Sequence, residues 1–195
     1  NFDETVALNL KIVPETTKKV GLGDSLTEAN EKAKGTYNKG IPLLAKKGKN
    51  IYKAEVEMPN FRLWQPDSPW LYQAQVRLNS DDMKGLQFGM RKFHQDLECA
   101  PKGMYYLNNQ KIRLRGANTM GFEQQAVMNK EFDRLIDDIL LAKICNMNFL
   151  RLTQRPVQDE VYEYCDKLGL MTQTDLPLFG CMRRTKFAEG IRQAE

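Results

Sequence analysis

The order of three stretches decides the fold of this chain: NFLRLTQRP (residues 148–156), DEVYEYCDKLG (159–169) and LMTQTD (170–175). The first stretch begins with apolar residues and then turns polar, as a short buried strand followed by a loop does. In the second, apolar residues recur at helical spacing until Gly169 supplies a helix stop. The third begins another strand. Because two strands joined by a helix of this length lie parallel, the sequence predicts a parallel strand–helix–strand unit.

Polar residues follow both of these predicted strands. In parallel barrels, site residues lie at the carboxyl ends of the strands. Those ends are residues 151–155 and residues 174–175. We therefore expect functional side chains within these two short segments.

The chain before this unit continues the alternation of strand and helix. Asn129 is a candidate helix cap, and apolar residues spaced three and four apart follow it as far as Ile144. Residues 115–118 precede this helix as a strand and its exit loop. The order strand, helix, strand, helix, strand predicts three strands of a barrel, with a further helix at residues 183–195.

A tight hairpin precedes the first of these strands. Residues 104–107 and 111–114 flank the turn Asn108–Gln110, and asparagine tolerates the backbone conformation that such a turn needs. The segment Pro101–Gly103 lies just before the hairpin. It is the best candidate for a domain boundary.

The first half of the chain alternates polar and apolar residues with a period of two. This pattern is typical of half-buried antiparallel strands, and it predicts a β-sandwich. Residues 21–40 are rich in glycine and lysine, and they predict a long loop with a short helix at 27–34. The predicted strands are residues 5–13, 51–58, 71–78 and 86–93, the last two joined by a turn at 79–82.

Three stretches of the chain resemble glycoside hydrolase family 2, the family of β-galactosidases, β-glucuronidases and β-mannosidases. WQPDSPWLY (64–72) with FGMR (88–91) is similar to the end of the family's immunoglobulin-like domain. YLNNQKIRLRGAN (106–118) is similar to the strand that leads into its catalytic barrel. The third stretch, Asn148 to Asp175, is the predicted strand–helix–strand unit.

The resemblance implies two domains. An immunoglobulin-like β-sandwich is expected over residues 1–100, followed over residues 101–195 by the amino-terminal part of a TIM-barrel glycosidase domain. A complete barrel needs about 250 residues, whereas the whole chain has 195. We therefore expect an incomplete barrel and a fragment of a longer enzyme.

The chemistry that the resemblance implies needs residues outside this chain. Retaining hydrolysis of a glycosidic bond uses two carboxyl groups about 5 Å apart, one as acid/base and one as nucleophile. In the family these are glutamates at the ends of the fourth and seventh barrel strands, which we expect beyond Glu195, so no catalytic residue is assigned here. Other carboxylates are expected to be solvated surface groups: Glu123, Glu131, Asp133, Glu160 and Glu163.

Four residues are candidates for substrate binding or active-site support: Asn118, Arg151, Gln154 and Asp175. Arg151 matches the family arginine that keeps the nucleophile carboxylate ionised through a charge-assisted hydrogen bond, and its structural alternative is a surface salt bridge. Asn118 matches an asparagine beside the sugar subsite, and otherwise forms a turn. Asp175 matches an acidic residue at the end of the third strand, and otherwise caps a helix.

Two residues depart from the family pattern. β-Galactosidases and β-glucuronidases carry a histidine where this chain has Gln154, and β-galactosidases carry another where it has Met120; His94 is expected in the sandwich. Glutamine has no positive charge, and methionine donates no hydrogen bond. The subsite is therefore altered. Residues 174–181 resemble the β-mannosidase branch, which keeps a β-mannosidase-type parent open.

Trp64, Trp70 and Tyr72 offer flat faces on which sugar rings stack. Their structural alternative is packing in a core or at a domain interface, beside Pro66 and Pro69. If they bound sugar, the chain would be a noncatalytic carbohydrate-binding or scaffold module. This is our second functional hypothesis.

The net charge of +4 comes from lysines in residues 18–53. A basic strip attracts nucleic acid or anionic polysaccharide, but aromatic residues do not interleave these lysines before Tyr37, so we expect a solvated loop and no nucleic-acid partner. The four cysteines show neither metal-ligand spacing nor a dense disulfide pattern. Cys145 and Cys165 lie on apolar stretches and are expected to be buried thiols.

We expect neither a cofactor nor a metal. The resemblance implies a β-glycoside as carbohydrate substrate, and it leaves a homo-oligomer open. We expect no membrane partner, because no stretch is apolar for long enough to span a bilayer. The first residues lack the apolar core of a signal peptide, yet the resemblance favours a periplasmic or secreted location over a cytoplasmic one.

Overall fold

The computed structural model of the chain describes residues 4–14, 36–45, 48–78, 82–98 and 101–177. The chain divides into two compact units. The first consists of residues 1–64 and 70–91, and the second of residues 65–69 and 92–195. The predicted domain boundary between residues 100 and 101 stays a prediction.

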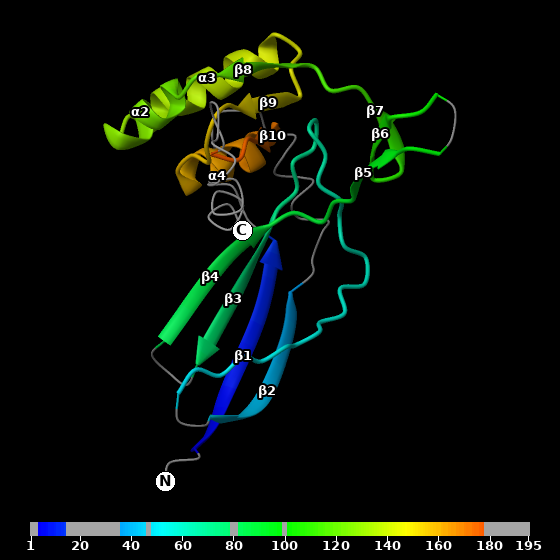
Figure 1. Cartoon of the computed structure of the whole chain (residues 1–195). Helices are drawn as coiled ribbons and strands as arrows, with labels where there is room; N and C mark the ends of the chain where they lie inside the picture. Colours follow the sequence, from blue (N-terminus) through cyan, green and yellow to red (C-terminus); the bar gives the residue numbers. More distant parts are fainter. Residues whose placement is uncertain (1–3, 15–35, 46–47, 79–81, 99–100, 178–195) are drawn as a thin grey trace, which may run out of the picture. The chain divides into compact units, whose positions relative to one another are not determined.

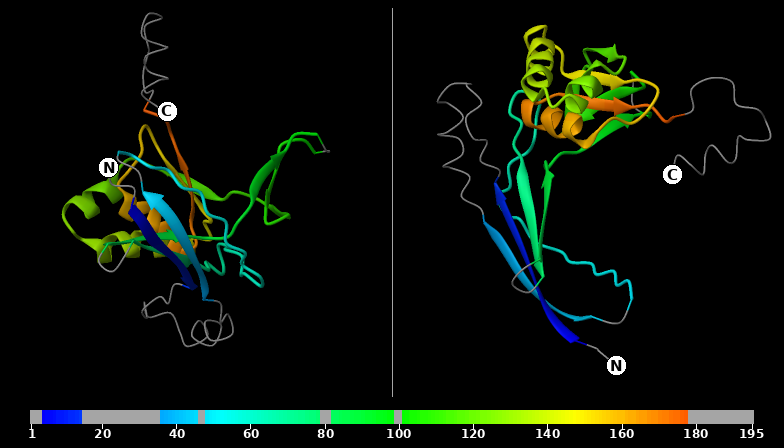
Figure 2. Two further views of the ribbon diagram at one scale, coloured as in Figure 1. Left: turned by 90° about the horizontal axis from the view of Figure 1, so that it is seen from below. Right: turned by 90° about the vertical axis from the view of Figure 1, so that its left-hand side faces the viewer.

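A four-stranded antiparallel sheet dominates the first unit (Figure 1). In spatial order the strands are β2 (Tyr37–Ala45), β1 (Glu4–Pro14), β3 (Tyr72–Leu78) and β4 (Asp82–Phe88). Leu10 of strand β1, which has a neighbour on each side, lies opposite Lys39 of β2 and Val76 of β3. Figure 2 shows from two further sides how the strands of this sheet twist relative to one another.

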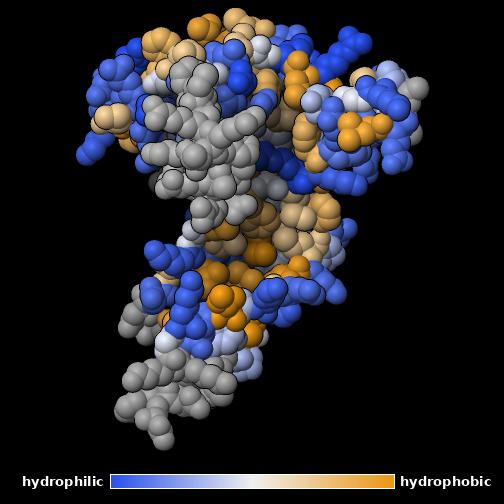
Figure 3. Space-filling model, viewed as in Figure 1, coloured by the Kyte–Doolittle hydropathy of each residue, from blue (hydrophilic) through white to orange (hydrophobic). Residues whose placement is uncertain are grey.

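The core of the first unit contains two aromatic residues from the family-like stretch 64–72. Trp70 and Tyr72 are buried together with Ile12. The Tyr72 ring stacks on Phe88 of the neighbouring strand with 5.7 Å between ring centroids. Hydrophobic side chains gather over this sheet (Figure 3), as expected for a sheet with one buried face.

The prediction of a strand at residues 51–58 is wrong, because this segment has no strand conformation. Val56 and Met58 nevertheless pack against the core of the unit. The period of two corresponds to side-chain contact only at Val56 and Met58, and the segment is not paired as a strand. The predicted strand at 86–93 is also corrected, since β4 ends at Phe88.

The sequence prediction misses β2. Its Gly40 and Pro42 weaken a strand pattern, because glycine adds no packing and proline donates no ladder hydrogen bond. Both are tolerated because β2 lies at an edge of the sheet. The predicted helices at 27–34 and 183–195 lie outside the described residues, as do Cys99 and Cys181.

The second unit contains the predicted hairpin. Strands β6 (Met104–Leu107) and β7 (Gln110–Ile112) pair antiparallel around Asn108 and Asn109, whose φ angles are 53° and 64°. Two successive left-handed residues are what a tight two-residue hairpin loop requires. The predicted hairpin is confirmed, but Gln110, expected in the turn, belongs to β7. Strand β5 (Phe93–Asp96) pairs with the other edge of β6.

His94 lies on β5 and not in the antiparallel sheet of the first unit, which corrects its expected location. Its register partner is Tyr106 of β6, and the two rings stack with centroids 5.2 Å apart. Strand β4 of the first unit ends at Phe88, and the chain then enters another sheet, in which Phe93 and the rest of β5 pair with β6.

A three-stranded parallel sheet forms the second half of this unit, in the order β10–β9–β8. It confirms the three predicted parallel strands and their helical connections, although two helices and not one connect β8 to β9. Helices gather around it in Figure 1. The elements are β8 (Gly116–Thr119), α2 (Phe122–Met128), α3 (Phe132–Ile144), β9 (Phe149–Leu152), α4 (Asp159–Leu168) and β10 (Met171–Thr174).

One face of the parallel sheet is buried by the helices. Leu152 of β9 is fully buried in a cluster with Leu135 and Ile139 of α3 and with Val161 and Cys165 of α4. Because side chains alternate along a strand, Phe149 and Arg151 project from the opposite face of β9. In a closed barrel that opposite face is the interior.

The start of α3 differs from the prediction. Asn129 is the residue that ends α2, and Glu131 precedes the first turn of α3. The sequence pattern did not reveal α2, because its seven residues form only two helical turns. The end of α4 is confirmed at Gly169, whose φ of 79° is the left-handed conformation that favours glycine.

The short segment 65–69 folds with the second unit although the residues on both sides of it belong to the first. Gln65 and Ser68 exchange backbone hydrogen bonds of 3.0 and 3.1 Å, which close a tight turn over Pro66 and Asp67. Lys143, near the end of α3, donates hydrogen bonds from Nζ to the carbonyl oxygens of Pro66 (2.8 Å) and Gly169 (3.0 Å).

Candidate functional site

The candidate site lies on the face of the parallel sheet opposite the helices. Asn118 of β8 and Gln173 of β10 are in register with Arg151 of β9. Residues in register on neighbouring parallel strands project from the same face, so the three side chains form one polar row across the sheet. The sequence identifies Asn118 and Arg151, and the register adds Gln173.

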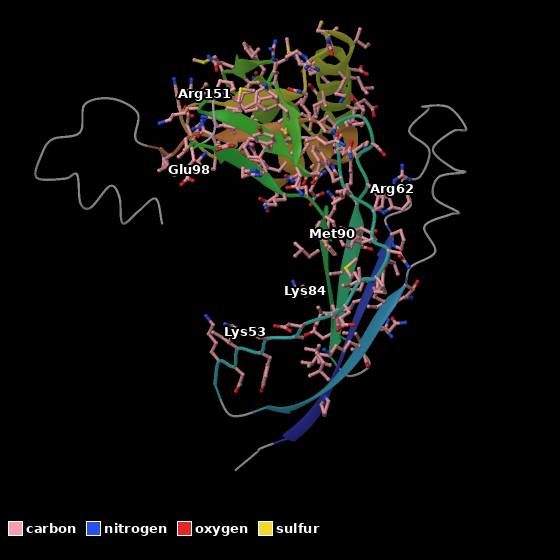
Figure 4. All side chains as sticks on the ribbon, turned by 90° about the vertical axis from the view of Figure 1, so that its right-hand side faces the viewer. Lys53, Arg62, Lys84, Met90, Glu98 and Arg151 are labelled. Atoms are coloured by element: carbon pink, nitrogen blue, oxygen red, sulfur yellow. The ribbon has the colours of Figure 1, made fainter. Side chains whose placement is uncertain are left out.

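Arg151 and Asp175 form a bidentate ion pair at the carboxyl end of this row. Nε of Arg151 donates to Oδ1 of Asp175 at 3.0 Å, and Nη2 donates to Oδ2 at 2.7 Å. Two parallel hydrogen bonds fix the plane of the guanidinium as well as its position. Figure 4 shows Arg151 toward the end of the sheet from which the chain leaves β10.

The carboxylate of Asp175 also accepts a hydrogen bond from the backbone of the loop that follows β9. The N–H of Gln154 donates to Oδ2 at 3.2 Å. The hydrogen bonds from Arg151 and then from Gln154 hold the pKa of Asp175 below its usual value. Asp175 is therefore ionised at neutral pH, and it connects the strand ends of β9 and β10.

Gln154 has a left-handed backbone conformation, with φ of 74°. This conformation is uncommon for a residue other than glycine, asparagine or aspartate, and it is retained where surrounding contacts impose it. The hydrogen bond to Asp175 is such a contact. The residue that stands in place of the family histidine is thus fixed through its backbone.

The loops that follow β8 and β9 are joined by Thr153. Its hydroxyl hydrogen-bonds to the carbonyl oxygen of Thr119 and lies 3.3 Å from the sulfur of Met120. Met120, the second departure from the family pattern, is exposed beside this contact. The ends of all three strands are consequently connected, by Thr153 on one side of Arg151 and by Asp175 on the other.

Glu123 is buried at the first turn of α2, which corrects its expected role as a solvated surface group. Its Oε1 accepts a hydrogen bond from the hydroxyl of Thr119 at 3.0 Å. Thr119 is in register with the buried Leu152 and not with Arg151. Its contact with Glu123 therefore lies on the face of the sheet that the helices cover. Glu123 supports the packing of β8 on α2.

The two described cysteines differ in burial. Cys165 is 1% exposed, and burial raises the pKa of its thiol to about 12, so it is an unreactive packing residue. Cys145, expected to be buried, is exposed at the end of α3. Within the described part of the chain, no group of three or more histidine, cysteine, aspartate or glutamate residues is placed to hold a metal ion.

The faces of the two tryptophans are occupied by arginine side chains. The guanidinium of Arg91 lies 4.5 Å from the ring centroid of Trp64, and that of Arg62 lies 4.7 Å from the centroid of Trp70. Both rings are also buried, Trp64 completely. Stacking against a sugar ring needs an open aromatic face, so this geometry favours the packing role of both residues.

Comparison with known families assigns both halves of the chain. The family model described as "Glycosyl hydrolases family 2" matches residues 2–91, and the one described as "Glycosyl hydrolases family 2, TIM barrel domain" matches residues 100–191. The chain belongs to glycosyl hydrolase family 2. Its architecture is the immunoglobulin-like domain of the family followed by the start of the TIM barrel.

Curated family 2 relatives are much longer than this chain. It is 30% identical to a β-galactosidase of Leuconostoc mesenteroides over 143 residues, which are 70% of this chain and 13% of that protein. It is 34% identical to a putative β-glucuronidase of Formosa agariphila over 124 residues, 60% of this chain and 14% of that protein. The chain thus spans less than a sixth of the length of these two relatives.

Solved family 2 structures have the same fold. A β-glucuronidase of Parabacteroides merdae aligns with a TM-score of 0.69 at 18% identity, over 97% of this chain and 22% of that chain. A β-glucuronidase of Bacteroides uniformis aligns with a TM-score of 0.69 at 23% identity, over 97% of this chain and 21% of that chain. At these identities the likeness concerns the fold. Among the described residues, no helix has the length and apolar character needed to cross a bilayer.

Proposed function

We propose that the chain is the sandwich domain and the first three barrel strands of a retaining β-glycosidase of the β-galactosidase type. In this proposal the acid/base and nucleophile glutamates stand at later strand ends, outside the chain. The chain itself supplies Asn118, Arg151, Gln154 and Asp175, which bind substrate or support the catalytic carboxylates. The substrate is a β-linked glycoside, and the enzyme works in the periplasm or outside the cell.

The placement of Arg151 carries this proposal. Its guanidinium projects from the barrel-interior face, at the strand end where barrel enzymes collect their site residues. A fixed cation at this point stabilises a neighbouring carboxylate in its ionised form, and a glycosidase nucleophile must be ionised to attack. Arg151 has further N–H groups beyond the two that Asp175 accepts, because a guanidinium has five.

The sugar is the open part of the proposal, and the likeness of residues 174–181 to the β-mannosidase branch makes a β-mannoside the alternative to a β-galactoside. Glutamine can both donate to and accept from a sugar hydroxyl, but it offers no charge to a uronic acid carboxylate. A β-glucuronide is accordingly the least suited of the three substrates. The uncharged side chain of Gln154 supports a neutral sugar over a uronic acid.

The test is a panel of nitrophenyl β-glycosides with the full-length protein. We expect turnover of the β-galactoside or the β-mannoside, slower turnover of the β-glucuronide, and a product that first appears as the β-anomer when followed by NMR. Absence of turnover with all three, or release of the α-anomer, would contradict the proposal. The Leu176→Ala variant, an exposed site next to Asp175, is a control for nonspecific effects of substitution at this loop.

A further inference from the structure

We propose that Asp175 is a positioning residue that fixes both Arg151 and the loop after β9, and that it does not bind the sugar. The inference rests on the proposed glycosidase function, and it gives Asp175 a third role beside the sugar contact and the helix cap that the sequence leaves open. Arg151 contacts the reacting carboxylate in this account. Asp175 acts through Arg151.

The geometry of the pair determines which donors of Arg151 remain for catalysis. Asp175 occupies Nε and one N–H of Nη2. The other guanidinium nitrogen, Nη1, is not part of the pair, and its direction is set by the planar fork as soon as the other two nitrogens are held. An arginine side chain without this partner rotates about four bonds. The ion pair therefore selects one orientation from many.

Asp175 is itself held in a single orientation. Its two oxygens accept three N–H groups, two from Arg151 and one from the Gln154 backbone. Its side chain is 20% exposed, against 42% for Arg151, so the carboxylate is the more enclosed member of the pair. Three of the about four acceptor sites of this carboxylate are thus occupied, whereas the more exposed Arg151 keeps N–H donors that Asp175 does not use.

The bond to Gln154 extends the effect of Asp175 to a second site residue. Gln154 has φ of 74°, and its N–H points at the carboxylate that also holds Arg151. One side chain directly after β10 thereby orients a cation on β9 and the backbone of a candidate sugar-binding residue in the loop after β9. Loss of Asp175 should release both together.

The test uses kinetics of the full-length protein. Asp175→Ala should lower kcat about 100-fold, as displacement of a reacting group by about 1 Å does. The acid limb of the pH profile of kcat/KM should move up by about one unit, because the nucleophile loses a fixed cation. Asp175→Glu, which keeps the carboxylate on a longer stem, should recover part of kcat and return the limb toward the wild-type position.

The direction of the pH shift separates positioning from simple charge compensation. If Arg151 stayed in place after loss of Asp175, its uncompensated charge would lower the pKa of the nucleophile, and the acid limb would move down. A downward shift, or a kcat within about twofold of wild type, would overturn the inference. Asp138→Ala on α3 removes an exposed carboxylate and should leave both quantities unchanged.

A second measurement does not depend on activity. The Nε–H signal of Arg151 should be resolved and protected from exchange in the NMR spectrum of the wild-type protein, and lost in Asp175→Ala and in Asp175→Asn. An unprotected signal in the wild type would overturn the inference even in an active enzyme. An inactive wild type with a protected signal that Asp175→Ala removes would refute the proposed glycosidase and retain the ion pair as the positioning element.

Discussion

Gly169, the residue that ends α4, meets two structural requirements at once. Its φ of 79° is a conformation that other residues adopt with strain. A Cβ atom built on it would lie 2.0 Å from the carbonyl oxygen of Pro66. The 65–69 turn can thus approach the backbone of Gly169 only because this residue has no side chain.

We predict that Gly169→Ala destabilises the protein by more than about 3 kcal/mol, because backbone strain and a steric clash with Pro66 add. Gly121→Ala is the matched control. Gly121 also has positive φ, 93°, but its Cβ would meet only the flexible Gln124 side chain at 3.5 Å. The control should cost about 1 to 2 kcal/mol. Equal losses in urea denaturation of the two variants would contradict the clash.

The residues of the candidate site could be proposed one by one from the sequence, but their contacts could not. Arg151 and Asp175 follow from their positions at strand ends, which a local sequence pattern reveals. Their pairing depends on the register between β9 and β10, and Gln173 enters the site only through that register. No pattern within a single strand encodes a register. Asp175 pairs with Arg151, and the helix that it was expected to cap as the structural alternative lies outside the described residues.

Among the elements, the 65–69 turn and α3 are connected by one lysine. Nζ of Lys143 donates to two carbonyl oxygens, those of Pro66 and Gly169, and lies 3.7 Å from the carboxylate of Asp67. Burial lowers the pKa of Lys143, against the opposing effect of Asp67. The hydrogen bonds offset the desolvation of the ammonium, and they anchor the turn at the amino-terminal side of β10.

We predict that Lys143→Met lowers the free energy of unfolding by about 2 kcal/mol, since it leaves two carbonyl groups without their charged donor. Lys167→Met is the control on the next helix. Lys167 lies 3.8 Å from Glu163 in an i,i+4 pair, and such surface pairs contribute less than about 1 kcal/mol. Thermal unfolding of both variants checks the difference. Similar melting temperatures for the two would show that Lys143 is an ordinary surface lysine.

The elements that the sequence predicts are those whose signal is local. The hairpin at 104–112 follows from two asparagines, and α4 from a helical period with a glycine stop. β2 was missed because an edge strand tolerates Gly40 and Pro42, and the sheet edge is a property of the assembled strands. The segment at 51–58, wrongly predicted as a strand, has an alternating sequence but is not paired as a strand.

At the scale of the whole molecule, the parallel sheet has two outer strands. Among the described residues, β8 and β10 each pair on one side only, with β9 between them. Unpaired strand edges favour association with other strands. A barrel site assembled from eight strand ends has, in these three, less than half of its wall.

We predict that the chain on its own neither hydrolyses nor measurably binds β-glycosides, and that it self-associates through the open strand edges. Calorimetric titration with galactosides, mannosides and glucuronides should give no heat at millimolar ligand, because the remaining strand ends lack preorganisation. Saturable binding that Trp70→Ala abolishes would instead favour the noncatalytic carbohydrate-binding module. Light scattering that reports a monomer at high concentration would contradict the self-association.

The most direct test of the glycosidase account is the turnover of the full-length protein after substitution of Arg151. Arg151→Ala should lower kcat/KM for the best nitrophenyl β-glycoside at least about 100-fold, because it removes the fixed charge beside the reacting carboxylate. Arg134→Ala on α3, where the arginine forms an exposed pair with Glu131, should leave kcat/KM unchanged. If Arg151→Ala turns over substrate as well as Arg134→Ala does, Arg151 is no part of the active site and the account is wrong.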